Sequence, residues 1–252
     1  MALLASCAGH QAQTEQSAES SPQSGALSGT PASPRSSAPS RTPASLRSST
    51  LSRAPAKPWL NMPDMVSGTL PKLLSQTGAF AAVRSLQHND TLLPYDLVQP
   101  FWSDGAIKTR FVALADAKVS FSPNGEWKFP PGTVFVKTFE LPTDATDRNS
   151  KRRLETRLLV VDREGGVYGV TYKWRADLSD ADLVAPEGLH EDISVRDAGG
   201  TRVQSWYYPS RADCIVCHNS HTNGVLGPKT RQMNRDLRYP DGITENQING
   251  FT

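Results

Sequence analysis

Two cysteines and a histidine within five residues are the part of this chain best suited to carry chemistry. The segment Cys214-Ile215-Val216-Cys217-His218 has the spacing C-x-x-C-H, which is the attachment signature of a c-type haem. On a helix, residues three and four apart share one face, so both thiols and the imidazole would project together. The motif predicts one covalent haem c, with Cys214 and Cys217 as thioether sites and His218 as the proximal iron ligand.

Two other chemistries use similar residues. Cys214, Cys217, His218 and His221 are four ligand-type residues within eight positions, and structural zinc binds Cys₂His₂ sets. Zinc sites usually bring their two ligand pairs from separate elements, with a longer gap than this. A C-x-x-C pair can also be a redox dithiol, but no thioredoxin-like βαβ pattern surrounds this one. Haem is therefore the favoured interpretation, and zinc is the main alternative.

The sixth position of the iron is less well defined by the sequence. Met233 lies downstream in the next expected helix and is the best sulfur candidate for a distal ligand; an ordinary apolar contact is the equal alternative. His221 is too close to His218 to reach the opposite side of the iron. Met ligation raises the reduction potential, and an open site allows small-ligand chemistry, so a haem enzyme or sensor is an alternative to an electron carrier.

A third cysteine lies near the start of the chain. Leu4-Ala5-Ser6-Cys7 resembles the lipobox of bacterial lipoproteins, in which the cysteine is acylated after export. A full secretory signal has a basic region and a longer apolar region, and only six residues, none of them basic, precede Cys7. We expect residues 1–7 to be a truncated signal with Cys7 lipidated; a stray cysteine is the alternative. One cysteine then takes lipid, two take haem, and none remains for a disulfide.

The composition changes along the chain and suggests its organisation. Residues 8–57 are dominated by Ser, Pro, Ala, Gly, Thr and Gln, so they have little apolar surface to offset the entropy of ordering. They are expected to form a disordered Ser/Pro-rich linker. A β-rich domain is expected over 58–208, followed by a helical haem segment over 209–252.

Charge, hydropathy and the lack of certain motifs narrow the classes of function that the chain could have. The chain has 27 Lys and Arg and 25 Asp and Glu, for a formal net charge of +2, so charge alone indicates no nucleic-acid partner. No apolar stretch approaches the ~20 residues of a membrane span, so membrane contact is expected through the lipid anchor only. The sequence has no dinucleotide fingerprint, phosphate-binding loop or paired-carboxylate site, which favours an electron carrier over a catalyst.

The residues that position the motif are mostly strand formers. Alternating apolar residues bounded by turn signals predict strands at 107–114, 119–121, 126–129, 133–141, 154–161, 167–174, 193–196 and 202–208. The segments 154–161 and 167–174 flank a turn-rich stretch and predict a hairpin. We expect a mainly β fold with sandwich-like antiparallel sheets, followed by the small helical segment.

Short helices are expected around the motif. Ser210 can cap a helix that carries the C-x-x-C-H residues, and Asp213 is favourable near its N-terminus. Further helices are expected over 229–237 and from near Thr244. Four arginines in this region could pair with the haem propionates, although a solvated basic surface is the more common role for any one of them: Arg211, Arg231, Arg235 and Arg238.

Several blocks of the sequence resemble one bacterial family. The most specific block surrounds the haem motif, and the blocks are residues 95–110, 127–137, 153–157, 206–219 and 227–234. Together they are similar to the exported c-type haem domains that occur as lipoproteins or fused to PQQ-dependent sugar dehydrogenases of the soluble β-propeller type. The resemblance implies a periplasmic or cell-envelope electron carrier whose redox partner is such a dehydrogenase or another cytochrome. Compared with that family, the chain is expected to be shortened at both ends.

Overall fold

The computed structural model describes residues 55–147 and 149–251. The expected signal segment with Cys7, and all but the last residues of the expected linker, lie outside the described residues.

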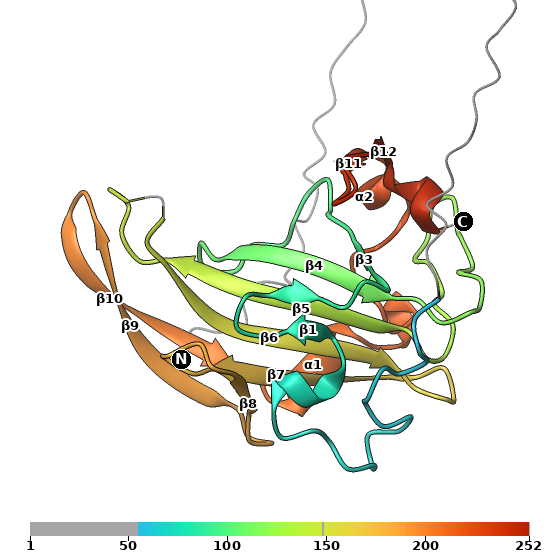
Figure 1. The fold of residues 1–252 in the computed structure, drawn as a ribbon, viewed down its shortest axis with the longest axis horizontal. Coiled ribbons are helices and arrows are strands. Elements are labelled where there is room, and N and C mark those ends of the chain that lie inside the picture. The colour runs from blue at the N-terminus through green and yellow to red at the C-terminus, as the bar shows by residue number, and fades with distance from the viewer. Residues whose placement is uncertain (1–54, 148, 252) are drawn as a thin grey trace, which may run out of the picture. The chain divides into compact units, whose positions relative to one another are not determined.

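A six-stranded antiparallel sheet forms the centre of the fold (Figure 1). Its strands, in spatial order, are β3 (Leu92–Pro94), β4 (Ile107–Ala113), β5 (Val134–Pro142), β6 (Lys151–Val161), β7 (Val167–Trp174) and β8 (Ala181–Leu183). Each strand pairs with the next strand in the sequence. Because side chains alternate between the faces of a strand, Val134 and Val136 face one side, whereas Phe135 and Phe139 face the other.

Smaller elements flank this sheet. The segment before it contains η1 (Leu74–Thr77), β1 (Phe80–Ala82) and β2 (Gln87–His88), and the segment after it begins with the hairpin of β9 (Leu189–Asp197) and β10 (Gly200–Tyr208). The remaining elements are α1 (Arg211–Cys217), η2 (Ser220–Thr222), α2 (Thr230–Met233), β11 (Asp236–Arg238), β12 (Thr244–Asn246) and η3 (Gln247–Phe251).

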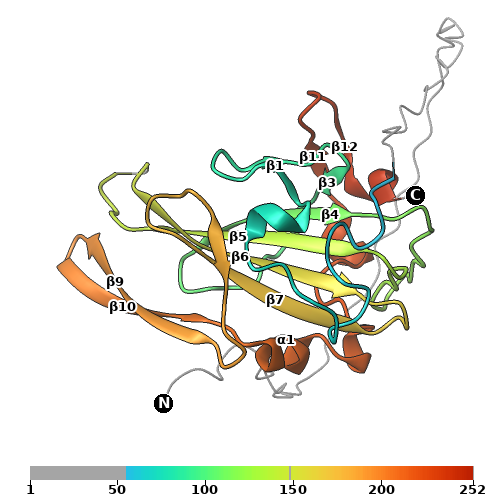
Figure 2. The ribbon, with the colours of Figure 1, turned by 60° about the horizontal axis from the view of Figure 1, so that its bottom comes forward.

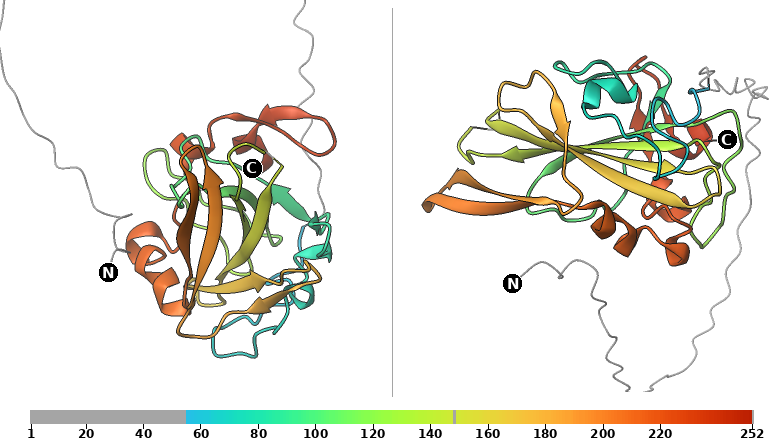
Figure 3. Two further views of the ribbon diagram at one scale, coloured as in Figure 1. Left: turned by 90° about the vertical axis from the view of Figure 1, so that its left-hand side faces the viewer. Right: turned by 90° about the horizontal axis from the view of Figure 1, so that it is seen from below.

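The two faces of the central sheet are covered by different parts of the chain (Figure 3). The segment that contains η1 and β1 covers one face, where Leu60, Leu74 and Phe80 pack with Val136 and Tyr172. The other face carries α1 and the β9–β10 hairpin (Figure 2), and residues of the C-terminal segment (residues 225–251) pack against Phe135 on that face.

Two separate apolar clusters lie on this second face. We call the first the C-terminal cluster, because Met233 and Phe251 pack there with Trp127 and Phe135. We call the second the hairpin cluster; its members include Phe139, Leu154, Ile193, Val195, Trp206 and Tyr208. Trp206 and Tyr208 of β10 are buried in this cluster. Polar residues of β4–β7 lie between the two clusters.

The expected mainly β, antiparallel fold is confirmed. The hairpin of 154–161 with 167–174 is also confirmed as the β6–β7 pair, and Asp162 accepts hydrogen bonds from the backbone N–H groups of Glu164 and Gly166 in its turn. The expected sandwich-like arrangement stays a prediction: besides the six-stranded sheet, the described residues form the two-stranded sheets β1–β2, β9–β10 and β11–β12. The expected strands 119–121 and 126–129 are reduced to a single bridge between Ser120 and Lys128.

Two helix predictions near the C-terminus were confirmed only in part. The helix expected over 229–237 ends at Met233, and the next residues form strand β11. The helix expected from Thr244 begins instead as strand β12, which pairs with β11, and becomes 3₁₀-helical only at Gln247. Pairing between the two strands satisfies backbone groups that a short helix of this sequence would leave open at its ends.

Candidate functional site

The helix α1 begins where the sequence predicted. Ser210 is its N-cap: the Ser210 hydroxyl accepts a hydrogen bond from the Asp213 N–H at 3.1 Å, and the Asp213 carboxylate accepts one from the Ser210 N–H at 2.9 Å. The Tyr207 hydroxyl donates to the same carboxylate at 2.6 Å and lowers the pKa of Asp213. Since so short a helix is not stable alone, this cap and its contacts with the sheet hold it.

The sheet contacts α1 at a glycine of β7. A Cβ placed on Gly169 would lie 2.6 Å from both the Cβ and the Sγ of Cys214, so only glycine allows this approach. The Thr171 hydroxyl donates to the Pro209 carbonyl at 3.0 Å and fixes the chain just before the helix. Burial raises the pKa of the Cys214 thiol, which keeps it protonated at neutral pH. Neither Cys214 nor Cys217 forms a disulfide, and both are partly buried.

The imidazole of His218 is held by the loop that follows it. His218 ends the helix, with its N–H bonded to the Cys214 carbonyl at 3.0 Å, and its Nδ1 lies 3.0 Å from the carbonyl oxygen of Gly224. The Leu226 N–H also approaches Nδ1, at 3.4 Å, but one nitrogen cannot donate and accept at once. The shorter contact favours a protonated Nδ1, because a carbonyl can only accept.

This arrangement leaves the second ring nitrogen available. With Nδ1 protonated, Nε2 carries the lone pair, which is how a ligating histidine is oriented in metal and haem sites. Burial lowers the pKa of His218, and the nearby Lys137 and Arg157 lower it further, so the ring is neutral at pH 7. The close packing of Gly224 against Val167, where an added Cβ would lie 2.7 Å from a methyl carbon, fixes the carbonyl that orients the ring.

The other expected ligands lie in different environments. His221 is exposed on η2. Met233 is completely buried in the C-terminal cluster, so the structure places it in an apolar contact, and its ligation of iron stays a prediction. Among residues 55–147 and 149–251, no group of three or more His, Cys, Asp or Glu side chains is arranged to hold a metal ion.

A row of basic residues that the sequence did not reveal crosses the sheet beside α1. Arg110 of β4 is paired in register with Lys137 of β5, and Lys137 with Arg157 of β6. Arg157 is in turn opposite Thr171 of β7, next to the Gly169 contact. We call the first three residues the basic row. The only sequence signal for it is the alternation of a basic residue with apolar ones in each strand, and their alignment depends on strand register.

Two of the three cations in the basic row have acidic partners. Arg157 makes a two-point contact with the buried Glu155, with N–O distances of 3.0 and 2.6 Å, and Arg110 pairs with Asp96 at 2.8 Å. No ion pair within the described residues involves Lys137; its Nζ lies 4.8 Å from the ring centroid of Phe139. Burial, followed by the charges of Arg157 and Arg110, lowers the pKa of Lys137 to about 7.

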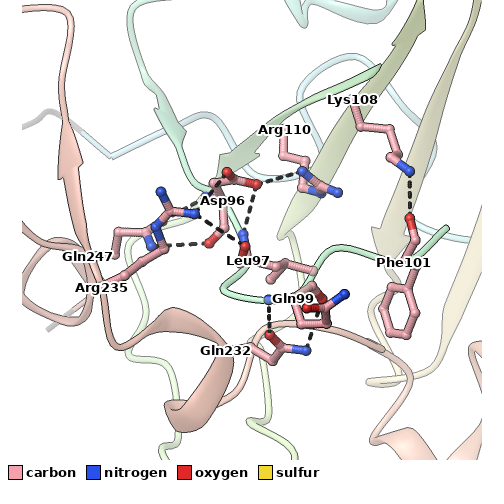
Figure 4. A network of polar contacts seen from close by, with 9 residues as sticks. All are labelled: Asp96, Leu97, Gln99, Phe101, Lys108, Arg110, Gln232, Arg235 and Gln247. Carbon is pink, nitrogen blue, oxygen red and sulfur yellow. Dashed lines mark hydrogen bonds and ion pairs between the residues drawn. The ribbon is translucent and has the colours of Figure 1, made fainter. Parts of the chain in front are cut away.

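Asp96 connects the basic row to the C-terminal segment (Figure 4). Its carboxylate also pairs with Arg235 at 3.2 Å, and its backbone N–H and C=O are bonded by the amide of the fully buried Gln247 at 2.7 and 3.1 Å. These bonds hold residues 95–97 at the edge of β4. Arg235, one of the four arginines considered for haem propionates, is thus occupied by Asp96.

Comparison with protein-family models, with curated proteins and with solved structures finds no match to this chain. No helix in the described ranges is both long and apolar enough to span a membrane.

Proposed function

We propose that the chain is a c-type cytochrome domain that carries one covalent haem and transfers electrons. The observation that carries the proposal is the position of His218. It lies at the end of the helix that carries Cys214 and Cys217, and its Nδ1 contact with the Gly224 carbonyl leaves the lone pair of the neutral ring on Nε2. The donor set fits the group, because a c-type haem takes two thioether bonds and one imidazole from such a segment.

Each residue of the site has a distinct role in this proposal. Cys214 and Cys217 provide the sulfur atoms of the two thioether bonds, and His218 is the proximal iron ligand. Gly169 lets α1 lie close enough to the sheet to hold Cys214 in place, and Gly224 orients the imidazole. The bound haem supplies a one-electron redox couple.

More particularly, we propose an exported, lipid-anchored carrier of the periplasm or cell envelope, with Cys7 as the acylated residue. It would exchange electrons with a PQQ-dependent dehydrogenase or another cytochrome. The lipobox-like Leu4-Ala5-Ser6-Cys7 segment, the Ser/Pro-rich composition of residues 8–57, and the resemblance of the haem-flanking blocks support this assignment.

The test is expression of the full chain behind a functional export signal, together with the cytochrome c maturation system. The expected product is red, gives a pyridine haemochrome spectrum of the thioether type, and keeps its haem through acid–acetone extraction. Cys214→Ala and Cys217→Ala should each remove one thioether bond and shift that spectrum. Cys7→Ala is the matched control, because it should keep the haem and lose only membrane association. A colourless protein with stoichiometric zinc would overturn the proposal.

The distal side of the iron requires its own measurement. Met233→Leu conserves side-chain volume in the C-terminal cluster. If Met233 ligates the iron, reduced Met233→Leu protein binds carbon monoxide readily, whereas the parent protein does not. Carbon monoxide binding that is the same in both proteins assigns Met233 to packing alone.

A further inference from the structure

The basic row has more positive charge than the surrounding chain balances. Arg110, Lys137 and Arg157 are directly opposite one another on three neighbouring strands, and like charges in such positions repel. Asp96 and Glu155 offset the two arginines. Lys137, between them, has no ion-pair partner among the described residues.

A second observation at the same place is a buried cationic donor. The side chain of Arg110 is only 4% exposed, yet its Nη2 atom is buried and has no hydrogen-bond partner in the described structure. A buried cationic donor without a partner costs free energy. The row therefore holds one amino group without an ion-pair partner, that of Lys137, and one guanidinium nitrogen without a hydrogen-bond partner, that of Arg110.

The basic row extends across the sheet away from α1. Cys214 contacts Gly169 on β7, and Lys137 and Arg110 lie two and three strands further along the sheet. With strands about 4.8 Å apart, these positions are about 10 and 14 Å from β7. This is the scale of a porphyrin measured from its vinyl-bearing edge to the opposite edge, where both propionates are attached. Leu159, Arg157 and Lys137, which lie along this path, are only partly buried.

We propose that the basic row is the propionate-binding site of the haem, with Lys137 as its principal contact and Arg110 and Arg157 beside it. This inference rests on the proposed haem function. In this proposal the basic row, rather than the arginines near the C-x-x-C-H motif, binds the propionates. One of those arginines, Arg235, is already paired with Asp96. Arginine and lysine are the side chains that bind carboxylates most strongly, and an anion here would compensate the charge of Lys137.

The first test measures the midpoint potential of the matured, haem-bearing protein. Lys137→Met should lower the potential, because removal of a cation beside the haem disfavours addition of an electron, whereas Lys137→Arg should keep it near the parent value. Lys151→Met is the matched control, since Lys151 is exposed at the far end of β6, about 20 Å along the strand from Arg157. If haem is attached but Lys137→Met and Lys151→Met have the parent potential, the propionate site is overturned while the haem function stands.

The second test separates carboxylate recognition from a general effect of charge. In the full-length Cys214→Ala/Cys217→Ala protein, haem can bind only reversibly. Haem should bind at least about tenfold more tightly than its dimethyl ester, the scale of one charge-assisted hydrogen bond, and Lys137→Met should reduce this preference. Equal binding of haem and ester by the parent overturns the inference. Absence of covalent haem from the matured parent overturns the haem function itself, and the propionate site with it.

Discussion

A side-chain carbon added to Gly169 would lie 2.6 Å from both the Cβ and the Sγ of Cys214. This contact between α1 and the sheet places the Cys214 side chain directly against β7. The position of the thiol thus depends on the absence of one methyl group in a neighbouring strand.

Gly169→Ala tests this dependence. The new methyl group must push α1 away from β7. The Cβ of Cys214 is bonded directly to the helix backbone, so side-chain rotation cannot move it aside. We expect a loss of about 1–3 kcal/mol in the free energy of unfolding, measured by urea denaturation, and a lower yield of covalent haem after maturation.

Gly199→Ala is the control for this substitution. Gly199 lies in the β9–β10 turn, and its added Cβ would approach only the side chain of Asp197, at 3.3 Å. We expect a change of less than about 0.5 kcal/mol. If Gly169→Ala has the stability and haem yield of Gly199→Ala, the contact with Cys214 does not position α1.

The parts of the site that the sequence predicted are those that depend on local spacing. The Ser210 cap, the helix carrying Cys214 and the β6–β7 hairpin all follow from neighbouring residues, and each is confirmed. By contrast, the alignment of Arg110 with Lys137 is a property of register between strands that are 27 positions apart at that pair. No local pattern specifies which residue faces which across a long connection.

The errors have a similar cause. The segment after Met233 has helix-forming residues, but pairing of β11 with β12 overrides that local preference. In the segment before β3 the apolar residues have no regular helical or strand spacing, so its role in covering the first face of the sheet was not predicted. Its residues Leu60 and Leu74 are almost completely buried there.

His88 should make stability sensitive to mild acid. Its ring stacks on Phe111 with centroids 3.5 Å apart, its Nε2 is buried without a partner in the described structure, and burial lowers its pKa from 6.5 to about 4. Between these values the unfolded chain binds more protons than the folded chain, so stability falls as the pH falls.

The test compares the parent with His88→Phe, which keeps an aromatic ring on Phe111 and removes the titrating group. From pH 6.5 to pH 4, the free energy of unfolding of the parent should fall by about 1–2 kcal/mol more than that of the variant. Parallel pH profiles for the two proteins would show that the ring is protonated equally well in the folded state.

Asp96→Asn should lower the free energy of unfolding far more than the same substitution at an aspartate in an exposed ion pair. The substitution removes a charge that balances Arg110, whose side chain is 4% exposed, and breaking one partner of a buried pair typically costs about 3–5 kcal/mol. Asp96 itself is 39% exposed, so we expect about 2–3 kcal/mol by urea denaturation.

Asp64→Asn provides the matched comparison. Asp64 pairs with Arg163 at 3.2 Å, and both side chains are about half exposed, at 45% and 58%. Such a pair contributes less than about 1 kcal/mol. Equal losses for Asp96→Asn and Asp64→Asn would mean that the charge of Arg110 is compensated by something other than Asp96.

Lys137 should limit the stability of the haem-free chain in a way that depends on pH. Burial, then the charges of Arg157 and Arg110, lowers its pKa to about 7 from 10.5. Between pH 7 and 10.5 the unfolded chain therefore binds more protons, and the stability of the parent rises with pH across this window. Below pH 7 the folded chain must keep a charged, unpaired ammonium beside two arginines.

Lys137→Met removes that charge, so the variant should be more stable than the parent by about 1–2 kcal/mol at pH 6, with a smaller difference at pH 10. Thermal unfolding of haem-free protein at both values measures the two differences. A gain that is the same at pH 6 and pH 10 would assign the effect to apolar packing of Met, because a gain that comes from removing the charge of Lys137 must differ between the two pH values.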